Sequence, residues 1–186
     1  PSTAELPLTA SESFGTFHLE GTRFDTAGLI PPVRDATGTV DYKGNDVDIT
    51  LASGTIYLPS GRTVAASNGT LAIKKANVPP VIGALDIDVA GEAPAVAELA
   101  SYDPINAMRL TGLVADDFTG GQVTGNVKAD IPLQKGVDRD RLNWLVALDY
   151  KGLSIGKPID GQIVSEAEGT IAVEKTQAVI AANPRL

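Results

Sequence analysis

Apolar and polar residues alternate along most of this chain. In DVDITLASG, which begins at Asp46, Ile49 and Leu51 alternate with Asp48 and Thr50. The same period of two recurs in residues 38–43, 54–58, 63–73, 85–89, 120–133 and 141–150. This period is typical of strands that bury one face. The sequence therefore predicts a mostly β fold.

Turn residues separate these runs at KGND (43–46), ASG (52–54), LPSGR (58–62) and SNG (67–69). Asn-Gly between alternating runs favours a hairpin, and short connections favour antiparallel neighbours. Residues 13–90 are accordingly predicted to form an antiparallel meander of about six short strands.

A unit of the form Gly-Thr-apolar-x-apolar occurs five times, beginning at Gly15, Gly38, Gly54, Gly69 and Gly169. We interpret it as a strand entry. Glycine at the exit of a turn tolerates positive φ or a close approach of another chain segment. The β-branched threonine then favours the start of a strand.

Residues 94–110 break the alternation with alanine, glutamate, leucine and methionine at helical spacing. They predict a short helical pair, in which the second helix starts at Pro104 with Asp103 as its N-cap. The 186 residues are expected to form one β-rich segment, with a meander over 1–90, a helical insertion over 91–118 and further strands over 119–186. Because the chain starts at Pro1 and stops abruptly, we interpret it as a segment of a longer protein.

Charge and composition exclude several classes of function. The formal net charge is −8, which argues against binding nucleic acid or anionic lipid headgroups through a basic patch. There is no cysteine, so disulfides and thiolate metal sites are excluded. No apolar run reaches the ~18 residues of a membrane-spanning helix.

The candidates for catalysis or metal binding each have a plainer explanation. His18, the single histidine, lies between Phe17 and Leu19 and fits an exposed strand position. Asp116-Asp117 fits an acid pair or a cap before a strand. Asp86, Asp88 and Glu92 lack the spacing of a Ca²⁺ loop, and Asn68-Gly69-Thr70 is a glycosylation sequon that also fits a turn. We therefore predict no enzyme activity, no cofactor and no metal.

Two long stretches carry a family resemblance. The first, LDIDVAGEAPAVAELASYDPINAMRLTGLVADDFTGGQVTGNVKADIPL (85–133), has a strand ending in glycine, a short helix, a Leu-Thr-Gly-Leu link and a strand ending in Ile-Pro-Leu. The second, LIPPVRDATGTVDYKGNDVDITLASGTI (29–56), has a Pro-rich entry to two strands. In these patterns the chain resembles, over roughly residues 14–182, the central region of the AsmA-like family of bacterial envelope proteins.

The resemblance implies a strongly twisted or curled antiparallel sheet that forms a β-groove or half-barrel. It implies a non-enzymatic segment of a periplasmic protein, anchored in the inner membrane, whose apolar groove carries phospholipid between the inner and outer membranes. The expected partners are phospholipid acyl chains and neighbouring segments of the same long chain. The expected lining residues are Val40, Tyr42, Ile49, Leu51, Ile56, Leu58, Leu71, Ile73, Leu85, Ile87 and Trp144.

A second interpretation stays open. An apolar sheet face is commonly plain core, covered by a helix or another sheet. Trp144 is then a core anchor rather than a groove aromatic, and the helix of residues 94–110 covers part of the sheet. In that case the chain is a structural or assembly scaffold with a closed core, which docks an envelope partner through its edge strands.

Overall fold

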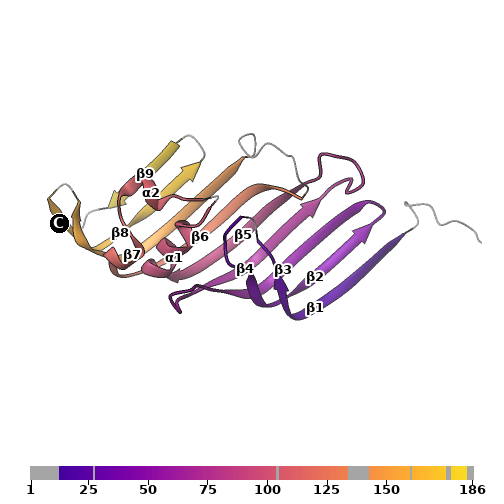
Figure 1. The fold of residues 1–186 in the computed structure, drawn as a ribbon, viewed down its shortest axis with the longest axis horizontal. Coiled ribbons are helices and arrows are strands. Elements are labelled where there is room, and N and C mark those ends of the chain that lie inside the picture. Colours follow the sequence, from indigo (N-terminus) through magenta and orange to yellow (C-terminus); the bar gives the residue numbers. More distant parts are fainter. Residues whose placement is uncertain are drawn as a thin grey trace, which may run out of the picture.

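Nine strands form one antiparallel sheet in the computed structural model, which describes residues 13–26, 28–103, 105–133, 143–159, 161–174 and 177–183 (Figure 1). The strands are β1 Phe14–Phe24, β2 Val33–Lys43, β3 Asp46–Tyr57, β4 Thr63–Ile73, β5 Ile82–Glu92, β6 Phe118–Pro132, β7 Trp144–Ile159, β8 Gln162–Glu174 and β9 Gln177–Asn183. Their order in the sheet is their order in the chain. The predicted mostly β, antiparallel fold is confirmed.

A helical insertion lies between β5 and β6. It comprises α1 (Ala93–Ala100), the one-turn α2 (Met108–Thr111) and the 3-10 helix η2 (Ala115–Asp117). Pro94 is tolerated because the first turn of a helix does not use that amide hydrogen. The second helix was expected to start at Pro104 with Asp103 as its N-cap, whereas the described α2 has Ala107 at its N-cap. Pro104 lies outside the described residues.

The meander over residues 13–90 contains five strands, not the expected six. KGND and LPSGR form the predicted turns, in which Gly44 and Gly61 have positive φ. ASG and SNG instead lie inside β3 and β4. At these places Ala52 and Ser53 are both exposed, and Asn68 has φ of 49°. A β-bulge needs the same backbone freedom as a turn, so turn-forming residues can also occur inside a strand. Here they change which residues of the strand face the core.

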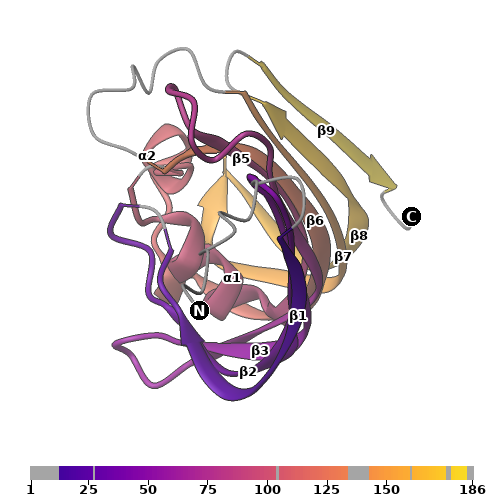
Figure 2. The ribbon, with the colours of Figure 1, turned by 90° about the vertical axis from the view of Figure 1, so that its right-hand side faces the viewer.

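Such irregularities recur across the sheet. Six strands contain an interior residue with positive φ: Gly21, Asp35, Asn68, Gly121, Gly152 and Glu166. The ladders shift register beside most of them. A bulge bends its strand and increases the twist. The sheet accordingly curls into an open trough, seen end-on in Figure 2, and does not close on itself.

The core lies on the concave face of this trough. Helix α1 sits inside the curve (Figure 2) and contacts β4, β5 and β6. Its buried Val96 and Leu99 join Leu51, Val64 and Val89 of the sheet in one apolar cluster. We call this part of the concave face, roofed by α1, the covered band.

The glycines of the repeated Gly-Thr unit do not mark turn exits, which corrects the sequence interpretation. Gly38, Gly54 and Gly69 lie inside β2, β3 and β4 without positive φ. Gly38 and Gly69 flank Leu51 on the neighbouring strands. A Cβ on Gly69 would lie 2.9 Å from the Leu51 Cβ. The unit therefore provides room for large side chains on a tightly curved face, through close approach rather than through φ.

Candidate functional site

An unbroken row of apolar residues crosses seven strands on the concave face. Each member is the direct cross-strand partner of the next: Phe17, Val40, Ile49, Leu71, Leu85, Ala129 and Trp144. Phe17 is 58% exposed and the other six are partly exposed. We call these seven residues the apolar row.

A second row runs beside the first, away from α1. Its members are Gly15, Tyr42, Val47, Ile73, Gly83 and Ile131. The ring of Tyr42 lies over Gly15, where a Cβ would come within 2.6 Å of the Tyr42 Cε1, and it stacks on Phe17 with ring centroids 5.9 Å apart. The apolar row and this second row together form what we call the open band.

The structure divides the eleven predicted lining residues into two groups. Val40, Tyr42, Ile49, Leu71, Ile73, Leu85, Ile87 and Trp144 are partly exposed on the concave face. Leu51, Ile56 and Leu58 are only 8%, 5% and 4% exposed and belong to the covered band. These three pack in the closed core beneath α1, so the predicted lining now rests on the other eight.

Sequence reasoning missed several residues of the open band. Phe17, Val47, Ala129 and Ile131 were not nominated, although each stands two residues along its strand from another residue of the same face. Alternation alone could have found Val47, two residues before Ile49. Ala129 alternates with Val127 and Ile131, but its place in the apolar row depends on the register of β6 against β5 and β7.

The convex face carries mostly polar side chains, with Phe14 and Leu145 as exposed apolar exceptions. Thr39 and Thr50 share a hydrogen bond there, and Lys74 pairs with Asp48 at 3.0 Å. His18 lies exposed opposite Thr39. This places the single histidine away from the concave face, as expected for an ordinary strand position.

Asp86 and Asp88 are also on the convex face, where they accept hydrogen bonds from Asn126 at 2.7 and 2.9 Å. These bonds lower the pKa of both carboxyl groups, with help from Lys128 at Asp86 and from Asn68 at Asp88. A lowered folded-state pKa stabilises the fold above the ordinary value of 3.8, and this contribution is lost as the pH falls through the lowered values. No group of acids or histidines within the described ranges is arranged to hold a metal ion.

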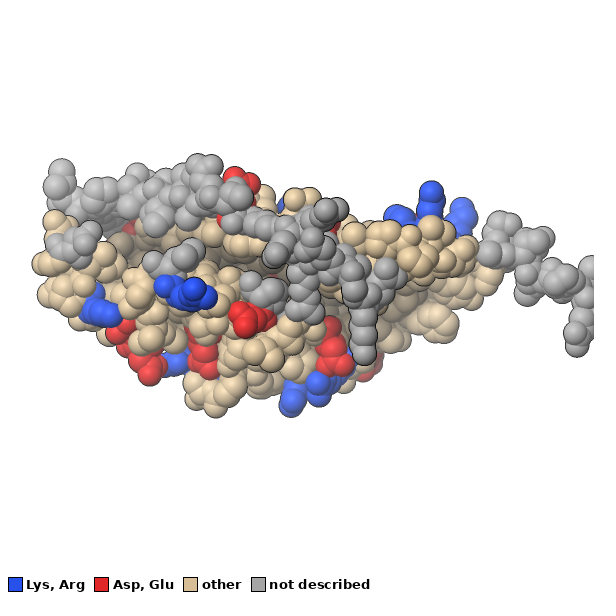
Figure 3. Space-filling view, turned by 45° about the horizontal axis from the view of Figure 1, so that its top comes forward, with Lys and Arg blue, Asp and Glu red and all other residues tan. Residues whose placement is uncertain are grey.

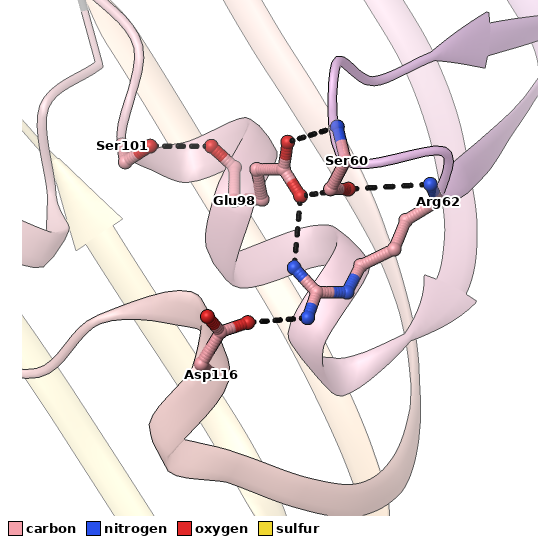
Figure 4. Close-up of polar contacts among 5 residues, drawn as sticks. All are labelled: Ser60, Arg62, Glu98, Ser101 and Asp116. Carbon is pink, nitrogen blue, oxygen red and sulfur yellow. Dashed lines mark hydrogen bonds and ion pairs between the residues drawn. The ribbon is translucent and has the colours of Figure 1, made fainter.

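Figure 4 shows the polar contacts that fix the insertion to the sheet. Arg62, at the end of the β3–β4 turn, donates to Glu98 of α1 at 3.0 Å and also pairs with Asp116 of η2. Ser60 donates to Glu98 from the same turn. Asp117 accepts the Val114 amide at 2.8 Å. Asp117 thus forms the cap before a strand that the plainer explanation predicted, whereas the ion pair of Asp116 was not predicted.

Arg62→Met is expected to lower the Tm and to speed amide exchange in α1, because Glu98 would keep its Ser60 contact but lose its cationic partner while only 13% exposed. Arg23→Met is the matched control, since the Arg23–Asp25 pair is largely exposed and should leave the Tm unchanged. Differential scanning calorimetry and hydrogen exchange measure both effects. Equal shifts in the two variants would show that the Arg62 contacts do not hold α1.

Charged side chains lie along the lower border of the trough in Figure 3, with a hollow of uncharged surface above them. No helix among the described residues has the length and hydropathy needed to cross a membrane. The two rows of the open band offer partly exposed aliphatic and aromatic side chains, which can bind an apolar ligand by exclusion of water.

Comparison with protein-family models, with curated proteins and with solved structures found no match to this chain.

Proposed function

We propose that this chain is a non-enzymatic segment of a phospholipid-carrying groove, and that the acyl chains lie on the open band. The observation that carries the proposal is the apolar row, which crosses seven strands without a polar side chain and remains partly exposed. The resemblance to AsmA-like envelope proteins supports the same role, a periplasmic location and a parent protein anchored in the inner membrane.

The chemistry of the row suits an acyl chain. Exposing a tail of about fifteen methylenes to water costs on the order of 12 kcal/mol, so a carrier needs a continuous apolar face. Seven strands at ~4.8 Å spacing give a row of about 29 Å, roughly twice the ~15 Å of half a bilayer core. An acyl tail can therefore move along the row by about its own length and still lie on an apolar surface.

Ile49→Asp tests the proposal, because it places a carboxylate in the middle of the apolar row. We expect the purified wild-type chain to bind a fluorescent phospholipid and the variant to lose most of this binding while its circular dichroism stays unchanged. Thr50→Asp is the matched control, since Thr50 is the exposed neighbour on the convex face. The control should bind like the wild type.

The scaffold interpretation remains the second candidate, and the covered band favours it. Leu51, Ile56 and Leu58 are buried, as in an ordinary core. If the wild-type chain binds no lipid and Ile49→Asp unfolds it, the scaffold interpretation replaces the groove. If Thr50→Asp weakens lipid binding as much as Ile49→Asp does, the effect is one of charge and the open band is not the site.

A further inference from the structure

The apolar rows can hold acyl chains, but they cannot hold a phosphate. A phosphodiester in a low-polarity trough needs a cation or hydrogen-bond donors. With the tails against the sheet, the phosphate must face the open side of the trough, where the insertion lies (Figure 2). The question is which positive charges reach that side.

Most of the positive charges in the described ranges lie elsewhere. Strand alternation places five of them on the convex face. Lys74 forms an ion pair with Asp48 on the same face, and Lys75 lies in the β4–β5 loop. The five are Arg23, Arg34, Lys43, Lys128 and Lys151. Arg62 is on the concave side but is paired with Glu98 and Asp116. Arg109 of α2 and Lys157 of β7 remain.

Arg109 lines a cavity in the insertion, and Lys157 is bonded to one of the other lining residues. A cavity of about 400 Å³ is lined by Ser101, Asn106, Arg109 and Gly112, with Met108, Leu113, Val114 and Ala115 as its apolar part. Lys157 of β7 does not line the cavity itself, but its Nζ donates to the carbonyl of Gly112, a lining residue, at 2.8 Å. A lysine ammonium has three donors, so two remain for a ligand.

The neighbouring acids are occupied by other contacts. Asp116 pairs with Arg62, and the Asp117 carboxylate accepts the Val114 amide. Within the described part of the chain Arg109 has no ion-pair partner. The volume falls within the range of small-ligand sites. The net charge of −8 argues against broad adsorption on an anionic surface, but it does not prevent local recognition by two cations.

We propose that this cavity binds the phosphate of a phospholipid, with Arg109 and Lys157 as its cationic ligands. The proposal rests on the proposed function, since the tails of the same lipid would occupy the open band. It extends that function from an apolar surface to recognition of a phosphate-bearing headgroup.

The test measures the Kd of three soluble probes for the purified wild-type chain and for two double variants. Dioctanoyl phosphatidylglycerol below its micelle concentration is the phospholipid probe, and dioctanoylglycerol is the same lipid without phosphate. The double variant Arg109→Gln/Lys157→Gln should bind the phospholipid about tenfold more weakly, as expected for lost hydrogen bonds to a charged group. It should bind the diglyceride unchanged. The control Lys43→Gln/Lys151→Gln removes the same charge from the convex face and should bind both lipids like the wild type.

Any one of three results would overturn this inference and leave the proposed function standing. These are unchanged phospholipid binding by the double variant, an equal loss in the control, or glycerol 3-phosphate binding as tightly as the phospholipid, which would indicate a site for soluble phosphate esters. Binding of neither lipid to the wild type would instead refute the proposed function, and the inference with it. Circular dichroism of both variants checks that the fold is retained.

Discussion

Leu51→Ala is expected to lower the free energy of unfolding by about 3 kcal/mol, the usual loss for a leucine buried in a packed core. Leu51 is 8% exposed and lies between Gly38 and Gly69 of the neighbouring strands. Helix α1 roofs this part of the face, so the sheet cannot collapse freely into the space left behind. Urea denaturation followed by circular dichroism measures the loss.

Leu71→Ala is the matched control for Leu51→Ala. Leu71 is on the adjacent strand and the same concave face, but it belongs to the apolar row and is partly exposed. Its truncation removes less buried area and should cost about 1 kcal/mol. Equal losses in the two variants would mean that the open band is packed as tightly as the covered band, which would favour the scaffold over the groove.

Gly38→Ala is expected to lower the free energy of unfolding by about 2 kcal/mol, although it adds only a methyl group. A Cβ at this position would lie 2.0 Å from the carbonyl oxygen of Thr50. That oxygen belongs to the backbone of β3, so relief requires the two strands to move apart. The same denaturation experiment measures the effect.

Gly120→Ala provides the comparison for Gly38→Ala. The nearest atoms to a Cβ on Gly120 are 4.0 Å away, and its φ is not positive. This substitution should leave stability unchanged or raise it slightly, because alanine restricts the unfolded chain. If Gly38→Ala is as well tolerated, the close spacing between β2 and β3 does not depend on the glycine, and the repeated Gly-Thr unit needs another explanation.

Much of the fold could be predicted from local pattern. The alternation in Val47, Ile49 and Leu51 fixes a strand with one apolar face, and the turn residues at Gly44 and Gly61 fix its neighbours as antiparallel. The helical insertion was visible because residues 94–110 change their period. The curled shape was expected only through the family resemblance, which the comparisons did not support.

The errors have a common physical cause. Ser67, Asn68 and Gly69 have the composition of a hairpin turn, yet here they bend a continuous strand. Both structures require a residue with positive φ, and the flanking sequence does not distinguish them. The division of the apolar face between covered and open bands depends on where α1 packs. That position is set in part by Arg62 and Glu98, which are 36 residues apart and give no local signal.

The sequential order of the nine strands has a consequence for synthesis and evolution. Each strand pairs with the strand synthesised immediately before it. Pairing can therefore begin while later parts of the chain are still being synthesised. Duplication or loss of one hairpin would lengthen or shorten the trough while leaving every other register intact. The length of such a trough is therefore a heritable variable that can change in steps of two strands.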